Sequence, residues 1–291
     1  MTHDRKRVAV VTGASSGIGL EAARTLAAQG WQVIASGRNP ERSAAAEQAI
    51  KAASSTGDVR MVIADLALMA DAARLADEVA KVTDRVDVLI NNAGGMATEK
   101  VMTPEGLEEN FAGNHLGPFL LTNRLLPLLR RAAAGNPNGP VRIINTASDA
   151  SEMVPGLNLD DLQNLDNYSV GLAYCSGKLA NVVFAAALTR RLESEGIVAY
   201  SIHPGIVDSN FFSAFDDESM ARIDAASMVT PQQGADTLIW LATSEEEGRT
   251  PGGYFHKRAP RPVNPLVQDE AFLQRFWDES EKLVARGLGQ R

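Results

Sequence analysis

The chain has 291 residues, of which 45% are hydrophobic and 22% charged, and its net charge of -8 gives an isoelectric point near 5.1. This acidity argues against a broad nucleic-acid surface, which is normally basic. The one cysteine, Cys175, excludes an internal disulfide framework and a cysteine-cluster zinc site, and the four histidines show no ligand spacing. We therefore expect neither a metal centre nor a nucleic-acid partner.

The chain begins with a basic run, Arg5-Lys6-Arg7, followed by only four apolar residues, Val8–Val11. A secretory signal needs a longer apolar stretch, and no run elsewhere in the sequence approaches the length of a membrane span. The sequence thus predicts a cytoplasmic protein without a membrane partner.

Short apolar runs alternate with longer amphipathic stretches. The expected strands are Val8–Thr12, Trp31–Ser36, Val59–Ala64, Val86–Asn91, Val141–Thr146, Val198–His203 and, more weakly, Gly253–His256. The expected helices are Ile18–Gln29, Ser43–Ala53, Asp71–Val82, Glu105–Arg131, Leu172–Glu195 and Gln232–Thr243. This alternation indicates right-handed βαβ units, and continuous apolar strands fit a sheet that is buried on both faces. We predict an α/β fold, a Rossmann-type doubly wound sheet of about seven parallel strands with helices on both faces and a C-terminal helical extension.

Two segments, 149–171 and 210–230, interrupt this alternation. Both are longer than typical connections, and long loops in compact domains are often lids or binding loops. The apolar residues of the second segment, Phe211, Phe212, Phe215 and Met220, form a substrate lid or pack as core, and the sequence leaves both readings open. After Lys257 the chain starts as a Pro-rich coil and ends in a helix, roughly Glu270–Ala285. No linker divides the elements, so we expect a single domain over residues 1–291, with 258–291 as a C-terminal extension.

A glycine-rich turn connects the first expected strand to the first expected helix. Glycine lets the backbone turn tightly and approach a phosphate closely, and a helix N-terminus adds free N–H groups and a favourable dipole. The turn is therefore the predicted pyrophosphate site of a dinucleotide. Its residues are Gly13, Ser15, Ser16, Gly17, Ile18 and Gly19.

The second expected strand ends at Ser36-Gly37-Arg38. An acidic residue at this point would bind the ribose 2′-hydroxyl and select NAD, whereas a nearby arginine accommodates a 2′-phosphate. Gly37 removes the carboxylate, and Arg38 supplies a planar cation that suits phosphate. We expect NADP(H) as the cofactor, with NAD(H) as the alternative.

Tyr174 and Lys178 lie four residues apart on an expected helix, and therefore on one face of it. An ammonium beside a phenol stabilises the phenolate and lowers the pKa of the tyrosine from about 10 toward neutrality. Such a tyrosine is a proton donor and acceptor for a carbonyl/alcohol pair. Tyr168 is the competitor, but Leu172 stands where it would need the ammonium.

These motifs together resemble the short-chain dehydrogenase/reductase family, whose glycine turn has the spacing Gly-x3-Gly-x-Gly. The resemblance covers essentially the whole chain. It implies cofactor contacts along the carboxyl ends of the strands, and it adds Tyr174 and Lys178 to them. The other contacts that it implies are Asp65, Leu66, Asn92, Ala93, Gly94, Pro204, Gly205, Val207 and Ser209. Ser209 replaces the threonine that is more usual in the family and retains its hydroxyl.

The resemblance also implies a catalytic group of Asn114, Ser148, Tyr174 and Lys178. In the family, tyrosine exchanges the proton, lysine keeps the pKa of the tyrosine low and binds the nicotinamide ribose, and serine donates a hydrogen bond to the developing alkoxide. Asn114 would hold a water that links Lys178 to solvent. Ser151, slightly past the end of the strand, is the alternative to Ser148.

The insert between Ser148 and Tyr174, the run Asn114–Gly117 and the ending Phe276–Leu283 are similar to the retinol dehydrogenase-like branch of the family. Membrane-bound relatives in that branch carry an N-terminal anchor, which this sequence lacks. We therefore expect a soluble member and do not carry retinoid activity over.

The expected function is NADP(H)-dependent hydride transfer between the nicotinamide and a small-molecule carbonyl or alcohol. One alternative is an NAD-dependent alcohol dehydrogenase. Another is a non-catalytic nucleotide-binding regulator on the same fold, which would be expected to lose the tyrosine or the lysine. The family usually pairs the helices Glu105–Arg131 and Leu172–Glu195 across subunits, which implies a homodimer or homotetramer.

Overall fold

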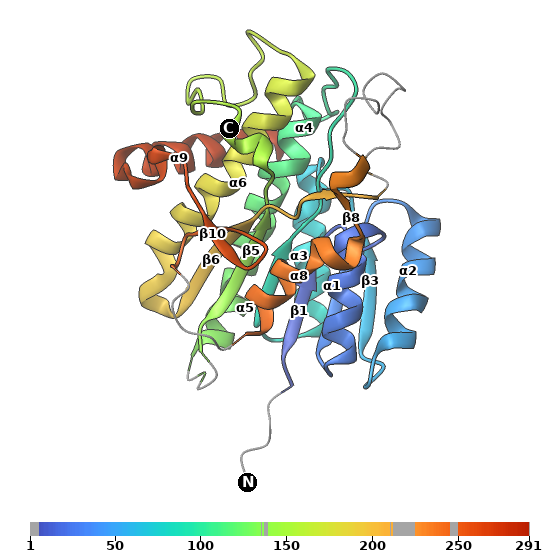
Figure 1. Ribbon diagram of the computed structural model, residues 1–291. Coiled ribbons are helices and arrows are strands. Elements are labelled where there is room, and N and C mark those ends of the chain that lie inside the picture. The colour runs from blue at the N-terminus through green and yellow to red at the C-terminus, as the bar shows by residue number, and fades with distance from the viewer. Residues whose placement is uncertain are drawn as a thin grey trace.

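Eight strands form one central sheet in the computed structural model, which describes residues 6–134, 136, 139–209, 211, 225–244 and 250–290 (Figure 1). Their spatial order is β10-β9-β6-β5-β4-β1-β2-β3. All neighbouring strands run parallel except β10, which pairs antiparallel with β9 at one edge. The strands are β1 (Val8–Val11), β2 (Gln32–Gly37), β3 (Val59–Ile63), β4 (Val88–Asn91), β5 (Val141–Thr146), β6 (Ile197–Ile202), β9 (Tyr254–His256) and β10 (Ala259–Arg261). A separate pair consists of β7 (Ile206–Val207) and β8 (Met228–Val229).

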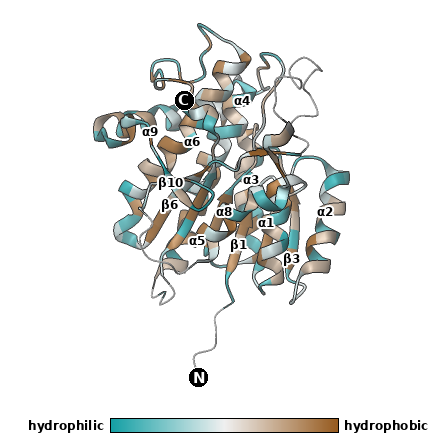
Figure 2. Cartoon of the chain, in the orientation of Figure 1, coloured by the Kyte–Doolittle hydropathy of each residue, from teal (hydrophilic) through white to brown (hydrophobic). Residues whose placement is uncertain are grey.

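Helices cover both faces of the sheet, and two hydrophobic clusters lie beneath them. One cluster joins the sheet to α3, α5, α6 and α9, and the other joins it to α1 and α8. Figure 2 shows the apolar strands enclosed between helices of mixed hydropathy. The helices are α1 (Gly17–Ala28), α2 (Pro40–Ala53), α3 (Met69–Val82), α4 (Glu109–Phe111), α5 (Gly117–Ala133), α6 (Val170–Leu192), α8 (Pro231–Thr243) and α9 (Glu270–Gly287). The predicted Rossmann-type doubly wound fold is confirmed.

The edge strand β10 lies in the Pro-rich segment for which the sequence predicted coil. Pro260 stands opposite Phe255 of β9 in the register. Proline lacks the N–H that a central strand needs, so it is tolerated in a sheet only at an edge. The prediction of coil was wrong here because the register of an edge strand depends on its partner rather than on its own composition.

The predicted helix over Glu105–Arg131 is divided in the structure. The carboxylate of Glu108 accepts hydrogen bonds from the backbone N–H groups of Asn110 and Phe111, so helical geometry starts only at α4. A π-helical turn over Ala112–Leu116 then follows, before α5 begins. Such single turns inside an α-helix are rare and occur frequently at functional sites.

Buried side-chain amides fasten α6 to the carboxyl ends of β4 and β5. Asn91 Nδ2 donates to Asn145 Oδ1 at 3.0 Å, and the two residues are paired in the register of the sheet. Asn145 Nδ2 donates to the carbonyl of Asn181 in α6, whose own Nδ2 donates back to the carbonyl of Thr146. Because buried amides are costly unless they are hydrogen-bonded, this network holds the helix at one height along the strands.

His115 of the π-helical turn is fully buried and lies among four aromatic rings, those of Phe111, Phe119, Phe184 and Phe276, at centroid distances of 4.9–5.7 Å. Burial lowers the pKa of His115 from 6.5 to about 3. Between these two values the unfolded chain binds a proton at this position and the folded chain does not, so stability falls as the pH falls.

We expect the free energy of unfolding to decrease below about pH 6.5, and His115→Phe to remove part of this pH dependence. The part removed is at most about 1.4 kcal/mol per pH unit, the value for one proton. Denaturant unfolding between pH 7 and pH 5 measures it. An unchanged slope in the variant would show that His115 is not buried in its neutral form.

Candidate active site

The site residues predicted from the sequence gather around one cavity of about 940 Å³ at the carboxyl ends of the central strands. In an open α/β sheet, ligands bind in the crevice outside these strand ends. All of the predicted catalytic and cofactor residues line this cavity except Gly19. The two competing side chains, Tyr168 and Ser151, do not line it.

The glycine turn between β1 and α1 forms one end of the cavity. Gly13 has φ +66°, and a Cβ on it would stand 2.8 Å from Cα of Ala93, so only glycine fits. Ser16 is the N-cap of α1 but makes no capping hydrogen bond with its side chain, and no acidic residue lies in the first turn. The first N–H groups of α1 are thus not capped by either kind of side chain, which fits the binding of an anion such as a pyrophosphate.

Gly19 has a packing role. A Cβ at this position would stand 2.4 Å from Nδ2 of Asn92 and 2.4 Å from the carbonyl oxygen of Gly13. The third glycine of the motif therefore lets α1 approach the end of β4 closely. Thr12, which was not among the predicted site residues, strengthens this junction because its hydroxyl accepts from the backbone N–H groups of Asn92 and Ala93.

Two arginines stand at the end of β2. Arg38 is largely exposed, and its Nη1 lies 3.9 Å from Oε1 of Glu109. Arg42, in the first turns of α2, lines the same part of the cavity and was missed in the sequence because it lies beyond the strand end. A Cβ on Gly37 would stand 2.6 Å from Oγ of Ser43, so the position has no room for an acidic side chain. Asp65 and Leu66, after β3, line the cavity nearby.

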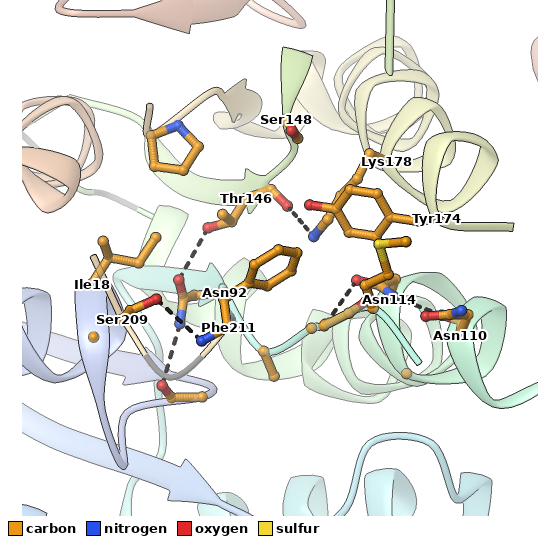
Figure 3. Close-up of a pocket in the computed structure, with 18 of the residues that line it drawn as sticks. Ile18, Asn92, Asn110, Asn114, Thr146, Ser148, Tyr174, Lys178, Ser209 and Phe211 are labelled. Carbon is orange, nitrogen blue, oxygen red and sulfur yellow. Dashed lines mark hydrogen bonds between the residues drawn. The ribbon is translucent and has the colours of Figure 1, made fainter. Parts of the chain in front are cut away.

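Tyr174 and Lys178 project from α6 into the other end of the cavity (Figure 3). Lys178 Nζ lies 5.6 Å from the centroid of the Tyr174 ring and donates to the carbonyl of Thr146 at 3.3 Å. Thr146 thus joins the end of β5 to the lysine, and its hydroxyl donates to Oδ1 of Asn92. The sequence did not reveal Thr146, because a backbone carbonyl acts here.

The pKa values of the pair differ from the sequence-based interpretation. Burial raises the pKa of Tyr174 to about 12, and the Ser148 hydroxyl only partly opposes this shift. Burial also lowers the pKa of Lys178 to about 8. The prediction that Lys178 lowers the pKa of Tyr174 toward neutrality is therefore wrong for this structure, because burial is the largest influence on this pKa and Lys178 is not among the groups that shift it. At neutral pH the phenol keeps its proton.

Ser148 stands at the end of β5 and is held by its neighbours. Its hydroxyl donates to Oδ1 of Asp149 at 3.0 Å and accepts from the N–H of Ala150 at 3.2 Å. The N–H of Asp149 donates to Nδ1 of His203, whose pKa burial lowers to about 4. His203 is thus neutral near pH 7. Asp149 and His203 both line the cavity, and Asp149 was not predicted from the sequence.

Asn114 lies in the π-helical turn, and its side chain points toward the loop after β4. Its Nδ2 donates to the carbonyls of Gly95 and Asn110, both at 2.8 Å, and its Oδ1 accepts from the N–H of Gly95 at 3.2 Å. A Cβ on Gly94 would stand 2.4 Å from that Oδ1 and 3.2 Å from Lys178 Nζ. Asn114 and Lys178 therefore both lie against Gly94.

The segment after β6 closes the cavity. Pro204, Gly205, Val207 and Ser209 line it, as the sequence predicted, and Phe211 joins them. The centroid of the Phe211 ring lies 5.6 Å from that of the Tyr174 ring. Both side chains are labelled in Figure 3. From the loop 149–171, Asp149, Ala150 and Met153 line the cavity near its start, and Gly171 does so at its end. Phe212, Phe215 and Met220 lie outside the described residues.

A dinucleotide-type glycine turn thus shares one cavity with a tyrosine, a lysine and a serine at the carboxyl edge of a parallel sheet. The turn suits a phosphate, and the phenol suits proton exchange with a carbonyl or an alcohol. This combination defines a nucleotide-dependent oxidoreductase.

Comparison with known proteins identifies the family to which the chain belongs. Residues 7–219 match the model of the short chain dehydrogenases. Retinol dehydrogenase 13 of Homo sapiens is 34% identical over 286 residues, which cover 96% of this chain and 84% of the relative. The chain therefore belongs to the short-chain dehydrogenase family and is similar to its retinol dehydrogenases, as the motifs predicted.

Solved structures agree with this assignment. An uncharacterized protein from Mycobacterium paratuberculosis has a TM-score of 0.73 at 31% identity, with 96% of this chain and 93% of that chain covered. A Pseudomonas aeruginosa RhlG/NADP active-site complex has a TM-score of 0.67 at 29% identity, with 85% and 93% covered.

These relatives correct the predicted cytoplasmic location. Retinol dehydrogenases are the branch in which membrane-bound members occur, so the short apolar run at Val8–Val11 does not decide the location. Within the described residues, one helix, Val170–Glu195, is long and apolar enough to cross a membrane, although 72% of its most apolar window is buried in the fold. A helix that is apolar on all sides also occurs in the core of a large domain. The prediction of a cytoplasmic protein is therefore wrong.

We expect Gly94→Ala to lower stability by about 1–3 kcal/mol, because the added methyl group would push into Oδ1 of Asn114. Gly95→Ala is the matched control, since a Cβ there meets nothing within 4 Å. Thermal unfolding of both variants measures the difference. Equal melting temperatures would mean that Asn114 does not lie against Gly94.

Proposed function

We propose that the protein is an NADP(H)-dependent oxidoreductase that interconverts a carbonyl compound and the corresponding alcohol, with Tyr174 as the general acid and base. The observation that carries the proposal is the position of Tyr174, Lys178 and Ser148 in the same cavity as the glycine turn. A cofactor phosphate at the turn and a substrate at the tyrosine can therefore be held together.

Each polar residue has a distinct part. When bound, the nicotinamide supplies the hydride for reduction or accepts it in oxidation. Tyr174 donates its proton to the carbonyl oxygen, and the same group removes the hydroxyl proton in the reverse direction. Ser148 donates a hydrogen bond to the developing alkoxide, for which its proton must turn away from Asp149. Burial keeps Tyr174 protonated at neutral pH, so the phenol carries the proton that carbonyl reduction requires.

Lys178 and Asn114 support the tyrosine in this proposal. Burial brings the pKa of Lys178 to about 8, so its ammonium releases a proton more readily than an exposed lysine would. Asn114 lies against Gly94, as does Lys178, and a water held there would link the lysine to solvent. The expected flow of the proton is from solvent through Lys178 to Tyr174.

Arg38 and Arg42 underlie the choice of NADP(H) over NAD(H). A 2′-phosphate placed at the end of β2 would meet two guanidinium groups, each able to donate parallel hydrogen bonds. Gly37, where a Cβ would collide with Ser43, excludes the carboxylate that NAD would need. The NADP in the Pseudomonas relative is consistent with this choice.

The alternatives are less well supported. An NAD-dependent enzyme would leave Arg38 and Arg42 without a ligand. A non-catalytic regulator would not need a buried lysine at the cavity, because burying the ammonium costs free energy without chemistry to use it.

We also propose that residues 1–291 form a single domain, since α9 of the extension packs on α6, α5 and α3. The expected homodimer or homotetramer stays a prediction. Every residue of α6 from 176 to 189 is buried within the chain itself, so a subunit contact through that part of α6 would have to displace its own neighbours.

Tyr174→Phe should lower kcat by about 100-fold or more, because proton transfer by a positioned side chain contributes about 10²–10⁴-fold. Binding of NADPH should be unchanged. Tyr168→Phe is the control, since Tyr168 lies outside the cavity and donates to Glu108. Absorbance of the reduced cofactor over a panel of aldehydes and ketones measures turnover. Retained turnover in Tyr174→Phe would refute the role of the phenol.

Arg38→Ala and Arg42→Ala should each weaken NADPH by about tenfold and leave NADH nearly unchanged, since one charged hydrogen bond is worth about 1.5–3 kcal/mol. Arg60→Ala, on the exposed side of β3, is the matched control. Fluorescence titration with both cofactors gives the ratio of dissociation constants. Equal losses for NADPH and NADH would exclude a 2′-phosphate site at these arginines.

A further inference from the structure

The C-terminal helix α9 crosses the outer side of the helix layer that carries the catalytic residues (Figure 1). In its first half, the Arg191 guanidinium of α6 lies 4.1 Å from the centroid of the Trp277 ring, and Nη2 of Arg191 donates to Gln274. At its end, a Cβ on Gly287 would stand 2.7 Å from Cγ of Met69, at the start of α3. The helix thus spans from α6 to α3 and passes over the π-helical turn between them.

At that crossing, Ser280 of α9 bonds to His115 of the π-helical turn. The distance from His115 Nε2 to Ser280 Oγ is 2.8 Å, and both residues are 0% exposed. Ser280 Oγ donates its one proton to the carbonyl of Phe276 at 2.9 Å, so it must accept from His115. His115 is therefore the neutral tautomer with its proton on Nε2.

This bond fixes the rotation of the turn. The aromatic rings around His115 restrict the orientation of the imidazole plane, and the hydrogen bond to Ser280 fixes the position of Nε2. A π-helical turn has wider hydrogen-bonded rings than an α-helix and occurs rarely, mostly as a single turn. His115 thus anchors the turn to α9 on the side that faces away from the cavity.

Asn114, the preceding residue, faces the cavity from the same turn. Its side-chain amide both donates to the carbonyl of Gly95 and accepts from the N–H of Gly95. The amide also lies beside Gly94, as does Lys178 Nζ. Adjacent residues of one turn share a peptide plane, so a shift of His115 also shifts Asn114. A change of about 1 Å in a supporting residue is enough to affect catalysis.

We propose that His115 and Ser280 are positioning residues for the reaction, and that the C-terminal extension acts on catalysis through them by aiming Asn114. The inference rests on the proposed function, in which Asn114 serves the proton supply of Lys178. Neither positioning residue lines the cavity. Their effect is therefore on kcat and not on the binding of the cofactor.

The test compares Ser280→Ala and His115→Phe, each made in the wild-type chain and in an Asn114→Ala background. Reduction of an aldehyde or ketone that the wild-type chain turns over with NADPH is the assay. We expect each single variant to lower kcat by about fivefold with an unchanged KM for NADPH, and Asn114→Ala to lower kcat by about tenfold or more. In the Asn114→Ala background, neither Ser280→Ala nor His115→Phe should lower kcat further.

Arg191→Ala is the matched control, because it removes a contact between α6 and α9 without touching His115. It should lower the melting temperature and leave kcat unchanged. If His115→Phe does not fold, Ser280→Ala decides alone, since it deletes one hydroxyl and adds no bulk.

Two results would overturn the inference while the proposed function stands. In one, Ser280→Ala lowers the melting temperature but not kcat. In the other, it lowers kcat equally with and without Asn114. An Asn114→Ala variant with wild-type kcat would instead refute the proposed role of Asn114, and the inference with it.

Discussion

The hydrogen bonds between the buried amides of Asn91, Asn145 and Asn181 are the interaction on which the site depends. They join two neighbouring strand ends to α6, so the height of this helix along the sheet is fixed. The carbonyl of Thr146 accepts from both Asn181 and Lys178, which makes the lysine part of the same network. Tyr174, one helical turn before Lys178, then reaches the cavity that begins at the glycine turn. The hydrogen bonds that fix α6 on the sheet therefore also position the predicted catalytic side chains.

The features that the sequence predicted well are those with a local physical cause. Gly13 is needed because its backbone has a positive φ and the next strand end is close, and both requirements follow from the motif. The four-residue spacing of Tyr174 and Lys178 likewise needs only a helix. Residues such as Arg42 and Asp149 were not predicted, because no motif marks them and their place in the cavity depends on how the turns after the strands fold.

The pKa of Tyr174 shows why charge alone was a poor guide. The sequence shows a cation near the phenol but not how much water surrounds either group. In the structure Lys178 is buried and Tyr174 is half-buried, and desolvation moves the pKa of Tyr174 up and that of Lys178 down, toward their neutral forms. The sequence likewise does not show what surrounds α6. Its apolar composition fits a membrane span and a core helix equally well, and only its packing distinguishes them.

The burial of α6 from 176 to 189 separates the site into two halves of different local stability. The half that carries Lys178 can open to solvent only when the core opens, so its backbone amides exchange hydrogen at rates set by global unfolding. Another part of the cavity wall comes from loop residues such as Met153, which is 77% exposed. Substitutions in that wall can change the shape of the cavity at little cost in folding free energy. Proton chemistry and substrate choice are thereby free to diverge independently of each other.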